Sequence, residues 1–423
     1  MTQSAAIAVG FPPLGTILIC SLGAGLMAAS GLLGAIADWL VANTPSRFLT
    51  PAVFLLGLVC HQLSDAFFVV YLPLCGVIFA RGGRPPEVGV FLGFAAFSGA
   101  FNAGFFPGIQ DIVLLDLTAR AASEAGIGDE IYPVSHLWFS MASALVLTGL
   151  SWAMCDGLLL RGKTEPERIR QPLQNDSRNG LVAAGLAVML VISFSAALMI
   201  IPGFRPLIDV DAAGVARYAP AFYSGTTILT LATGSAGLAF GFASHRWKSG
   251  ADVSQAFRTV MNDMTPFILI AIGIGFIVKA VEVSNLGVFA ASQLATVLQA
   301  AELARPALAA LLALGSALAD LILFSASAKW AVMAPVLVPA LHQAGLDPVA
   351  VTAAFRVGDA AFNIINPIQP AAAYALVCAR NWVSDMTVGR LIVNMSRYSC
   401  MYLVTGVCLL LIWIGSSLPF GLT

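Results

Sequence analysis

The stretch Asp320–Trp330 reads DLILFSASAKW, and it lies in the middle of a long apolar segment, 303–342. A helix needs about 20 residues to cross a bilayer, so this segment is too long for one span. Its centre is polar and rich in small residues, and non-helical backbone is tolerated at membrane depth only where protein or water satisfies it. We therefore predict that 303–342 forms a re-entrant hairpin whose tip contains Ser325.

The composition of the whole chain places this hairpin in an integral membrane protein. The 423 residues are 59% hydrophobic and 10% charged, with a mean hydropathy of +0.88, whereas about a quarter of the residues in a soluble domain are charged. These values exclude a cytosolic enzyme and a disordered chain, and 21 Lys+Arg against 22 Asp+Glu disfavour a nucleic-acid binder. We predict an all-α polytopic protein of the inner (cytoplasmic) membrane, with the lipid bilayer as a partner and nucleic acid excluded.

Four hydrophilic loops separate the apolar runs and indicate which way the spans cross. Basic residues dominate the loops 157–179 and 245–263, whereas the loops 119–131 and 203–221 carry acidic residues. Because loops rich in Lys and Arg stay in the cytoplasm, we place the first two loops there and the other two outside. The loops then alternate between the two sides, as successive spans require.

The first half of the chain contains the same features as the second. The run 42–80 is also too long for one helix and has the polar midpoint Cys60–Asp65, so it predicts another hairpin. Glycine, asparagine and proline interrupt apolar runs at 98–111 and at 358–370, which predicts two broken helices. Each half is therefore expected to hold one re-entrant hairpin and one broken transmembrane helix.

Sparse identities between the halves favour an internal duplication, because Pro73 and Pro86 recur as Pro335 and Pro348 at one constant spacing. Paired interrupted helices in corresponding halves are typical of secondary transporters with binding sites at the membrane midplane. We predict two inverted repeats. Residues 1–156 form the first repeat with its hairpin at 42–80, 157–179 a cytoplasmic linker, 180–263 connecting spans, and 264–423 the second repeat with its hairpin at 303–342.

Ionisable side chains inside apolar runs are costly in a bilayer and therefore mark candidate functional sites. Arg356 and Asp359 lie three residues apart, on one face if the segment is helical, and Asn363 follows them. One interpretation is a structural ion pair that braces the broken helix. The other is a cation site, in which Asp359 and Asn363 bind Na⁺ or Asp359 carries a proton, while Arg356 faces an anionic substrate through its planar guanidinium.

Three further residues are candidates, each with an ordinary structural alternative. Asp111 follows a helix break, and it either caps the next helix or belongs to the site. Asp320 lies in the first arm or at the tip of the second hairpin, where a buried carboxyl group must be paired or protonated and an exposed one is hydrated. Trp330 follows the tip serines, and it either packs in the protein or stacks on an aromatic ligand.

The sequence lacks the common catalytic motifs. It contains no HExxH, GxSxG or Walker P-loop, and its seven cysteines are scattered singly. We therefore predict that the protein is not an enzyme and needs no cofactor beyond a coupling ion. Two other classes stay open. One is a passive channel, and the other is an intramembrane aspartyl protease, for which Asp111 and Asp359 are the only plausible dyad.

The most specific motifs run from SASAKWAVMAP, which begins at Ser325, through Asp347-Pro348 and the RVGD of 356–359 to Asn363-Ile-Ile. Weaker motifs include FPPLG at 11–15 and GGRPP at 82–86. Together these motifs resemble the p-aminobenzoyl-glutamate transporter family, which belongs to a wider ion transporter superfamily. The resemblance extends over nearly the whole chain from Phe11 onward.

The resemblance implies a homodimer in which hairpins and broken helices line the route of a small organic anion. It implies uptake of aminobenzoyl-glutamate or efflux of sulfonamide antimetabolites, driven by Na⁺ or H⁺, with dicarboxylates or short-chain fatty acids as the alternative substrates. The substrate-binding residues by motif match are Asp111, Trp330, Pro348 and Arg356, and the sodium-site carboxylate is Asp359. With the hairpin tips, we expect the cation-binding set Asp359, Asn363, Asn102, Asp320, Ser64 and Ser325, with Asp359 and Asn363 as the ligands of Na⁺.

The chain also departs from the family pattern. Asp320 replaces an asparagine, Cys60-His61 replaces a Ser-Asn pair, and the family's first spanning helix is expected to be missing because the chain begins near the motif at Phe11. By this resemblance, an aspartate at position 320 either adds a charge to the cation site or makes the site responsive to protons. We therefore predict a divergent secondary active transporter that works by alternating access.

Overall fold

The computed structural model describes residues 12–63, 65–128, 130–161, 175–200, 209–210, 216–217, 225–284, 286–300 and 303–422. Most of the predicted linker 157–179 and of the loop 203–221 therefore lies outside the described residues. Within the described ranges the protein is almost entirely helical, and the one sheet is a two-stranded antiparallel ribbon, β1 (Asp209–Val210) with β2 (Ala216–Arg217). The all-α prediction is confirmed.

The first half of the chain contains long helices joined by short 3₁₀ and π turns. In order they are α2 (Pro12–Ser30), α3 (Leu32–Asn43), η1 (Ser46–Phe48), α4 (Leu49–Leu63), η2 (Asp65–Phe67), α5 (Phe68–Arg81), α6 (Pro86–Phe94), the π-helix η3 (Ala95–Gly99), α7 (Ile109–Glu124), α8 (Leu137–Met154), the π-helix η4 (Cys155–Leu159) and α9 (Asn175–Ile200).

The second half follows a similar order of helices. It consists of α11 (Gly225–Ala243), α12 (Gly250–Val283), α13 (Leu286–Ala300), α14 (Arg305–Asp320), α15 (Ala326–Gln343), α16 (Pro348–Asn363), α17 (Pro370–Arg380) and α18 (Val388–Gly415). Proline is the first residue of α6, α16 and α17, where its fixed φ suits a helix start and its missing N–H is not needed.

Four of the described helices are long and apolar enough to cross a membrane: Ser46–Leu63, Leu137–Leu159, Asn175–Leu198 and Val388–Gly415. A fifth span results if Leu18–Ser30 and Leu32–Asn43, which meet at 68°, are counted as one broken helix. The bend lies at Gly31, whose φ of 82° is a left-handed conformation that glycine adopts without a Cβ penalty.

The helix interruptions fall where the sequence predicts them. Helix α4 ends at Leu63 and α14 ends at Asp320, at the expected hairpin tips, while residues 100–108 and 364–369 separate the halves of the two broken helices. Whether the two halves are related as inverted repeats stays a prediction. One boundary differs, because α12 begins at Gly250 inside the expected loop 245–263 and so runs across the predicted domain border at 263/264.

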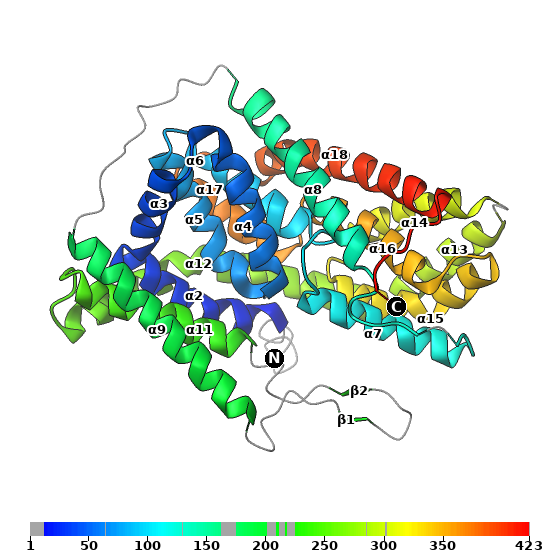
Figure 1. Cartoon of the computed structure of the whole chain (residues 1–423), viewed down its shortest axis with the longest axis horizontal. Helices are drawn as coiled ribbons and strands as arrows, with labels where there is room; N and C mark the ends of the chain where they lie inside the picture. The colour runs from blue at the N-terminus through cyan, green and yellow to red at the C-terminus, as the bar shows by residue number, and fades with distance from the viewer. Residues whose placement is uncertain are drawn as a thin grey trace.

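The two broken helices each place their parts in different hydrophobic cores (Figure 1). The first core contains buried residues of α3 to α6 together with α17, and the second contains buried residues of α13 to α16 together with α7. Helix α7 packs against α15 and α16, and α17 packs against α5 and α6. Each core is therefore completed by a helix from the other half of the chain, and the two breaks lie where the chain passes between the cores.

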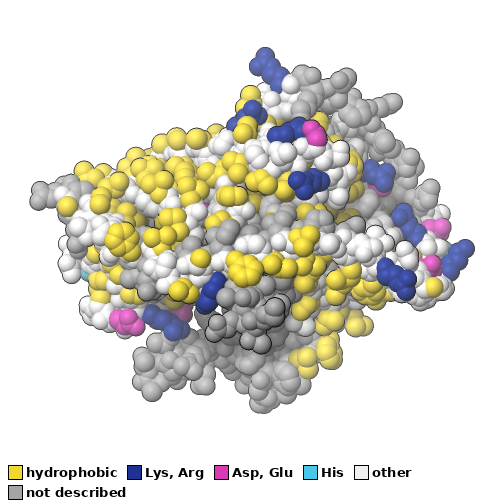
Figure 2. Space-filling view, turned by 180° about the vertical axis from the view of Figure 1, so that it is seen from behind, with side chains coloured by type: hydrophobic (Ala, Val, Ile, Leu, Met, Phe, Trp, Pro, Cys, Tyr) yellow, Lys and Arg dark blue, Asp and Glu magenta, His cyan; other side chains and the backbone are white. Residues whose placement is uncertain are grey.

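The outer surface of the helices is largely apolar, as Figure 2 shows for one face. Large hydrophobic side chains on α9 are exposed, among them Leu186, Leu190 and Phe194, and Leu190 keeps 71% of its surface. Contiguous exposed apolar surface of this kind marks a membrane or protein contact. It fits a helix that faces lipid.

Candidate functional site

The central feature of the second core is a cluster of three buried charges. Lys329 contributes its ammonium group from the first turn of α15, and the Nζ atom lies 2.7 Å from Oδ1 of Asp320 at the end of α14. The same Nζ forms an ion pair with Oδ1 of Asp359 on α16. All three side chains are completely buried. We call Asp320, Lys329 and Asp359 the charge triad.

Close packing of α14 on α16 brings the two carboxyl groups of the triad together. A Cβ atom at Gly358 would overlap the carbonyl oxygen of Ala313, so only glycine permits this approach of the two backbones. The Ser316 hydroxyl donates a hydrogen bond of 2.8 Å to the carbonyl of Phe355 and ties the same helices together. Asp359, one residue after Gly358, is thereby placed beside the end of α14.

The tip of the second hairpin holds Lys329 in position from the other side. The hydroxyl of Ser325 caps α15 by accepting a weak 3.4 Å bond from the N–H of Ala328, and the Lys329 N–H donates to the Ser325 carbonyl at 2.8 Å. From the second helix break, the side-chain amide of Asn366 donates to the backbone carbonyl of Asp320. The triad therefore joins the hairpin tip to both a packed helix and a helix break.

A second buried charge cluster surrounds Arg356, one turn before Asp359 on α16. Its Nη1 forms an ion pair with Oδ1 of Asp111 on α7, and its Nη2 donates 2.8 Å to the carbonyl of Phe101 in the first helix break. The other carboxylate oxygen of Asp111 accepts 2.7 Å from the N–H of Gly108. Asp111 thus caps the start of α7 and also pairs with Arg356, and its role in substrate binding stays a prediction.

His136, which precedes α8, completes the Arg356 cluster. Nη1 of Arg356 lies 3.2 Å from Nδ1 of His136, and Nε2 of His136 lies 2.9 Å from the carbonyl of Val349. Because a guanidinium only donates, Nδ1 must accept and Nε2 must carry the hydrogen. The imidazole is therefore neutral in this arrangement and bridges Arg356 and the backbone near the start of α16 by two hydrogen bonds.

Trp330 lies between these clusters and is fully buried. Its indole stacks on the ring of Phe355, with ring centroids 4.3 Å apart, and its Nε1 donates 2.9 Å to the hydroxyl of Thr118 on α7. The Thr118 hydroxyl in turn lies 2.7 Å from that of Thr352 on α16. The face on which an aromatic ligand could stack is thus occupied by Phe355 in this conformation.

Asn363 connects the two helix breaks. Its side-chain amide donates 3.3 Å to the carbonyl of Ser98 in η3, and its Oδ1 accepts 2.7 Å from Gln369 in the second break. Asn102 is buried in the first break. The amide side chains therefore hold the polar backbone at the crossing of the two cores, as buried irregular backbone requires.

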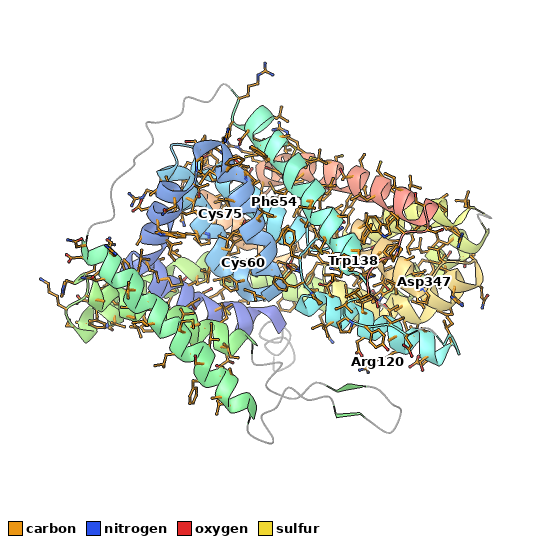
Figure 3. The ribbon with its side chains drawn as sticks, in the orientation of Figure 1. Phe54, Cys60, Cys75, Arg120, Trp138 and Asp347 are labelled. Carbon is orange, nitrogen blue, oxygen red and sulfur yellow. The ribbon has the colours of Figure 1, made fainter. Side chains whose placement is uncertain are left out.

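The structure assembles most of the expected site residues in two groups. Asp320 joins Asp359, and Asp111 joins Arg356, whereas Pro348 is the first residue of α16, following the cap that Asp347 provides. In this conformation Asp359 contacts Lys329 and Asn363 bonds to Gln369, and the binding of Na⁺ by Asp359 and Asn363 stays a prediction. Ser64 lies outside the described residues. Figure 3 places Asp347 and Arg120 in the part of the molecule that contains α7 and α16, away from Cys60 of the first hairpin.

The sequence-based prediction missed four residues that take part in the ion pairs and hydrogen bonds around the charge triad, Trp330 and Arg356. Lys329 carries a charge inside an apolar run, nine residues after Asp320, and that spacing was a usable signal for a buried pair. Thr352 shares a helix face with Arg356, four residues on. Thr118 and His136 offered no comparable signal, because only the tertiary packing of α7 and of the turn before α8 brings them to α16.

A family model described as the AbgT putative transporter family matches residues 1–423 of this chain. The chain belongs to this family. It is 28% identical over 417 residues to the p-aminobenzoyl-glutamate transport protein of Escherichia coli K12, covering 97% of this chain and 82% of that protein. AbgT members are transporters, so this chain is a multi-pass membrane transporter and not an enzyme.

Two solved structures resemble the fold. The Alcanivorax borkumensis YdaH transporter matches with a TM-score of 0.60 and 30% identity, covering all of this chain and 89% of that one. Neisseria gonorrhoeae MtrF, described as illuminating a class of antimetabolite efflux pumps, matches with a TM-score of 0.55 and 27% identity, covering 97% of this chain and 83% of that one.

The alternative of an intramembrane aspartyl protease required Asp111 and Asp359 to act as a pair. In the structure they pair with different cations, Arg356 and Lys329.

Proposed function

We propose that this AbgT-family protein is a secondary active transporter of the inner membrane that moves a small organic anion by alternating access, coupled to an Na⁺ or H⁺ gradient. The substrate is aminobenzoyl-glutamate-like or a sulfonamide-type antimetabolite, and the working unit is a homodimer. The name of the Escherichia coli relative supports the first substrate class, and the description of MtrF supports the second.

The observation that carries this proposal is the buried guanidinium of Arg356. Its two terminal nitrogens have protein partners, but Nε is buried and has no acceptor among the described residues. A buried donor without a partner costs about 1–3 kcal/mol, and an oxygen of a carboxylate or sulfonamide would satisfy it. The stacked Trp330 and Phe355 rings lie beside it, and the ring of such a substrate would displace Phe355 to stack on the face of Trp330 that Phe355 now covers.

The crossing of the two cores supports an alternating-access mechanism. The Arg356–Asp111 pair joins α16 to α7, whose preceding break leads into the other core, and Asn363 bonds to Ser98 across the same crossing. A substrate anion that competes with Asp111 for Arg356 would loosen one of these links. Binding would thereby bias the relative position of the two cores, which is the differential contact that a conformational change requires.

Transport by purified protein in proteoliposomes tests the proposal. We expect accumulation of labelled p-aminobenzoyl-glutamate or a sulfonamide against its own gradient when an Na⁺ or H⁺ gradient is imposed. Arg356→Lys keeps the charge but loses the planar fork, so we expect at least a tenfold slower flux. Arg120→Lys is the matched control, because Arg120 is a half-exposed residue of α7 that pairs with Asp116 of its own helix.

The same assay separates the alternatives. Flux that runs only down the substrate gradient would identify a passive channel. A response to dicarboxylates or short-chain fatty acids alone would assign the transporter to small carboxylates. Equal rates for Arg356→Lys and the control would remove Arg356 from the substrate site.

A further inference from the structure

We propose that Lys329 is a tethered cation that fills the ion site at the second hairpin tip, so that Na⁺ does not bind between Asp320 and Asp359 in this chain. The sequence left Na⁺ binding at Asp359 and Asn363 open beside a proton on Asp359, and the arrangement of the side chains argues against the Na⁺ site. The ion-binding statement stands independently of the substrate. Its consequence for energy coupling rests on the proposed function.

The position of the ammonium group is the first argument. Nζ of Lys329 contacts one oxygen of each carboxyl group, 2.7 Å from Asp320 and in an ion pair with Asp359. A metal cation that bridges two carboxylates would occupy the same place between them. The lysine stem is fixed there, because the N–H of Lys329 is bonded to Ser325 and the ring of Phe355 lies 5.6 Å from Nζ.

The charge balance of the triad is the second argument. Arg356, the buried cation of α16, pairs with Asp111 on α7, whereas Lys329 of α15 contacts both Asp320 and Asp359. On the other helices that pack here, Arg305 is at the far end of α14, Arg120 pairs with Asp116, and Arg390 and Arg397 of α18 are exposed.

The two carboxyl groups of the triad share the Lys329 ammonium group as a common partner. Their oxygens that face away from Lys329 receive no hydrogen bond from a described donor. Lys329 is the cation that both carboxyl groups contact, and Asp320 gives it a second carboxyl partner.

Two oxygen atoms near the triad already accept hydrogen bonds from protein groups. Oδ1 of Asn363 accepts the hydrogen bond from Gln369, and the backbone carbonyl of Asp320 accepts from Asn366. Among the described residues, no group of three or more His, Cys, Asp or Glu side chains could hold a metal ion. Removing the lysine side chain would expose two facing carboxylates, and this change should create an Na⁺ site where the native chain has none.

Thermal unfolding and binding of radioactive Na⁺ by the full-length purified protein test this inference. We expect the native protein to unfold at the same temperature in NaCl and in choline chloride of equal concentration, and to bind no Na⁺ saturably. Lys329→Met should gain a saturable rise of the unfolding temperature with Na⁺, because a ligand that binds only the folded state stabilises it. Lys329→Met/Asp359→Asn should lose that gain.

Two results would overturn the inference. One is saturable Na⁺ binding by the native protein that Asp359→Asn abolishes. The other is a folded Lys329→Met protein that stays indifferent to Na⁺. If Lys329→Met fails to fold, the native protein and Lys329→Arg, which keeps the tethered charge, decide the question, since both must be indifferent to Na⁺. Loss of substrate flux in proteoliposomes with Na⁺ indifference intact would contradict the proposed function alone.

Discussion

The tips of the two hairpins lie at corresponding places in the chain but are stabilised by different chemistry. At the second tip, the buried charges of Asp320, Lys329 and Asp359 meet. At the first tip, the ring of His61 packs edge-on against Phe97 and Phe101, and the side chain of Gln62 bonds to the backbone of the first helix break. When the described side chains of the two tips are compared, the ion pairs lie at the second tip.

The comparison shows that the tip of a hairpin can be stabilised either by buried ion pairs or by ring packing and amide hydrogen bonds. At both tips, side-chain amides form hydrogen bonds with irregular backbone, which needs such partners at membrane depth. Among the described side chains, the second tip has three buried charges in contact, whereas the contacts at the first tip are those of His61 and Gln62. We therefore expect ion-dependent behaviour to follow substitutions at the second tip, and substitutions at the first tip to change stability alone.

Replacement of Lys329 by methionine should cause the largest loss of stability. It leaves Asp320 and Asp359 buried without their cation, and removal of one partner of a buried ion pair costs about 3–5 kcal/mol. Chemical unfolding in detergent without Na⁺ measures this loss. Lys248→Met on an exposed loop is the control and should change stability by less than about 0.5 kcal/mol. A loss of similar size for both variants would show that the triad is not a stabilising contact.

Replacement of Gln62 by leucine tests the first tip. The Gln62 amide donates to the carbonyl of Phe106, and its Oε1 accepts 3.3 Å from the N–H of Phe105, so both backbone groups would lose a partner. We expect a loss of about 2 kcal/mol that is the same in NaCl and choline chloride. The exposed Gln255→Leu is the matched control. An Na⁺-dependent loss would contradict the assignment of ion chemistry to the second tip.

Replacement of Trp330 by phenylalanine separates packing from hydrogen bonding beside the second tip. A phenyl ring can keep the stacking on Phe355, but the bond from Nε1 to Thr118 disappears. Thr118 retains its contacts with Leu114 and Thr352, so we expect a loss of only about 1 kcal/mol. Trp138→Phe, on an exposed side chain, is the control. A loss above about 3 kcal/mol, the scale of aromatic truncation, would mean that the indole shape itself is required.

Sequence reasoning predicted the helix breaks well because their causes are local. Pro86, Pro348 and Pro370 begin helices, and the polar residues near Ser325 interrupt an apolar run that is too long for one span. The crossing of α7 and α17 between the two cores could not be read from the sequence, because contacts between distant segments leave no periodic signal.

The same distinction applies to the site. Asp111, Asp320, Arg356 and Asp359 were found because charge is costly in a membrane wherever it lies. Their partners depend on tertiary packing. The spacing of Arg356 and Asp359 allowed a mutual ion pair, yet the packing of α14 against Gly358 directs Asp359 to Lys329, while α7 supplies Asp111 to Arg356.

Replacement of Ser325 by alanine should have the smallest effect and probes how tightly the second tip positions Lys329. The hydroxyl accepts a long 3.4 Å bond from Ala328, whereas the cap of α16 at Asp347 accepts 2.7 Å from Val349. We expect a loss of about 0.5 kcal/mol for Ser325→Ala and about 1 kcal/mol for Asp347→Ala, with Ser327→Ala as the control. The Lys329 N–H bonds to the backbone carbonyl of residue 325, which alanine retains, so the triad should persist and Ser325→Ala should stay indifferent to Na⁺. A gain of Na⁺ binding in this variant would show that the serine hydroxyl, and not the helix backbone, keeps the lysine in the site.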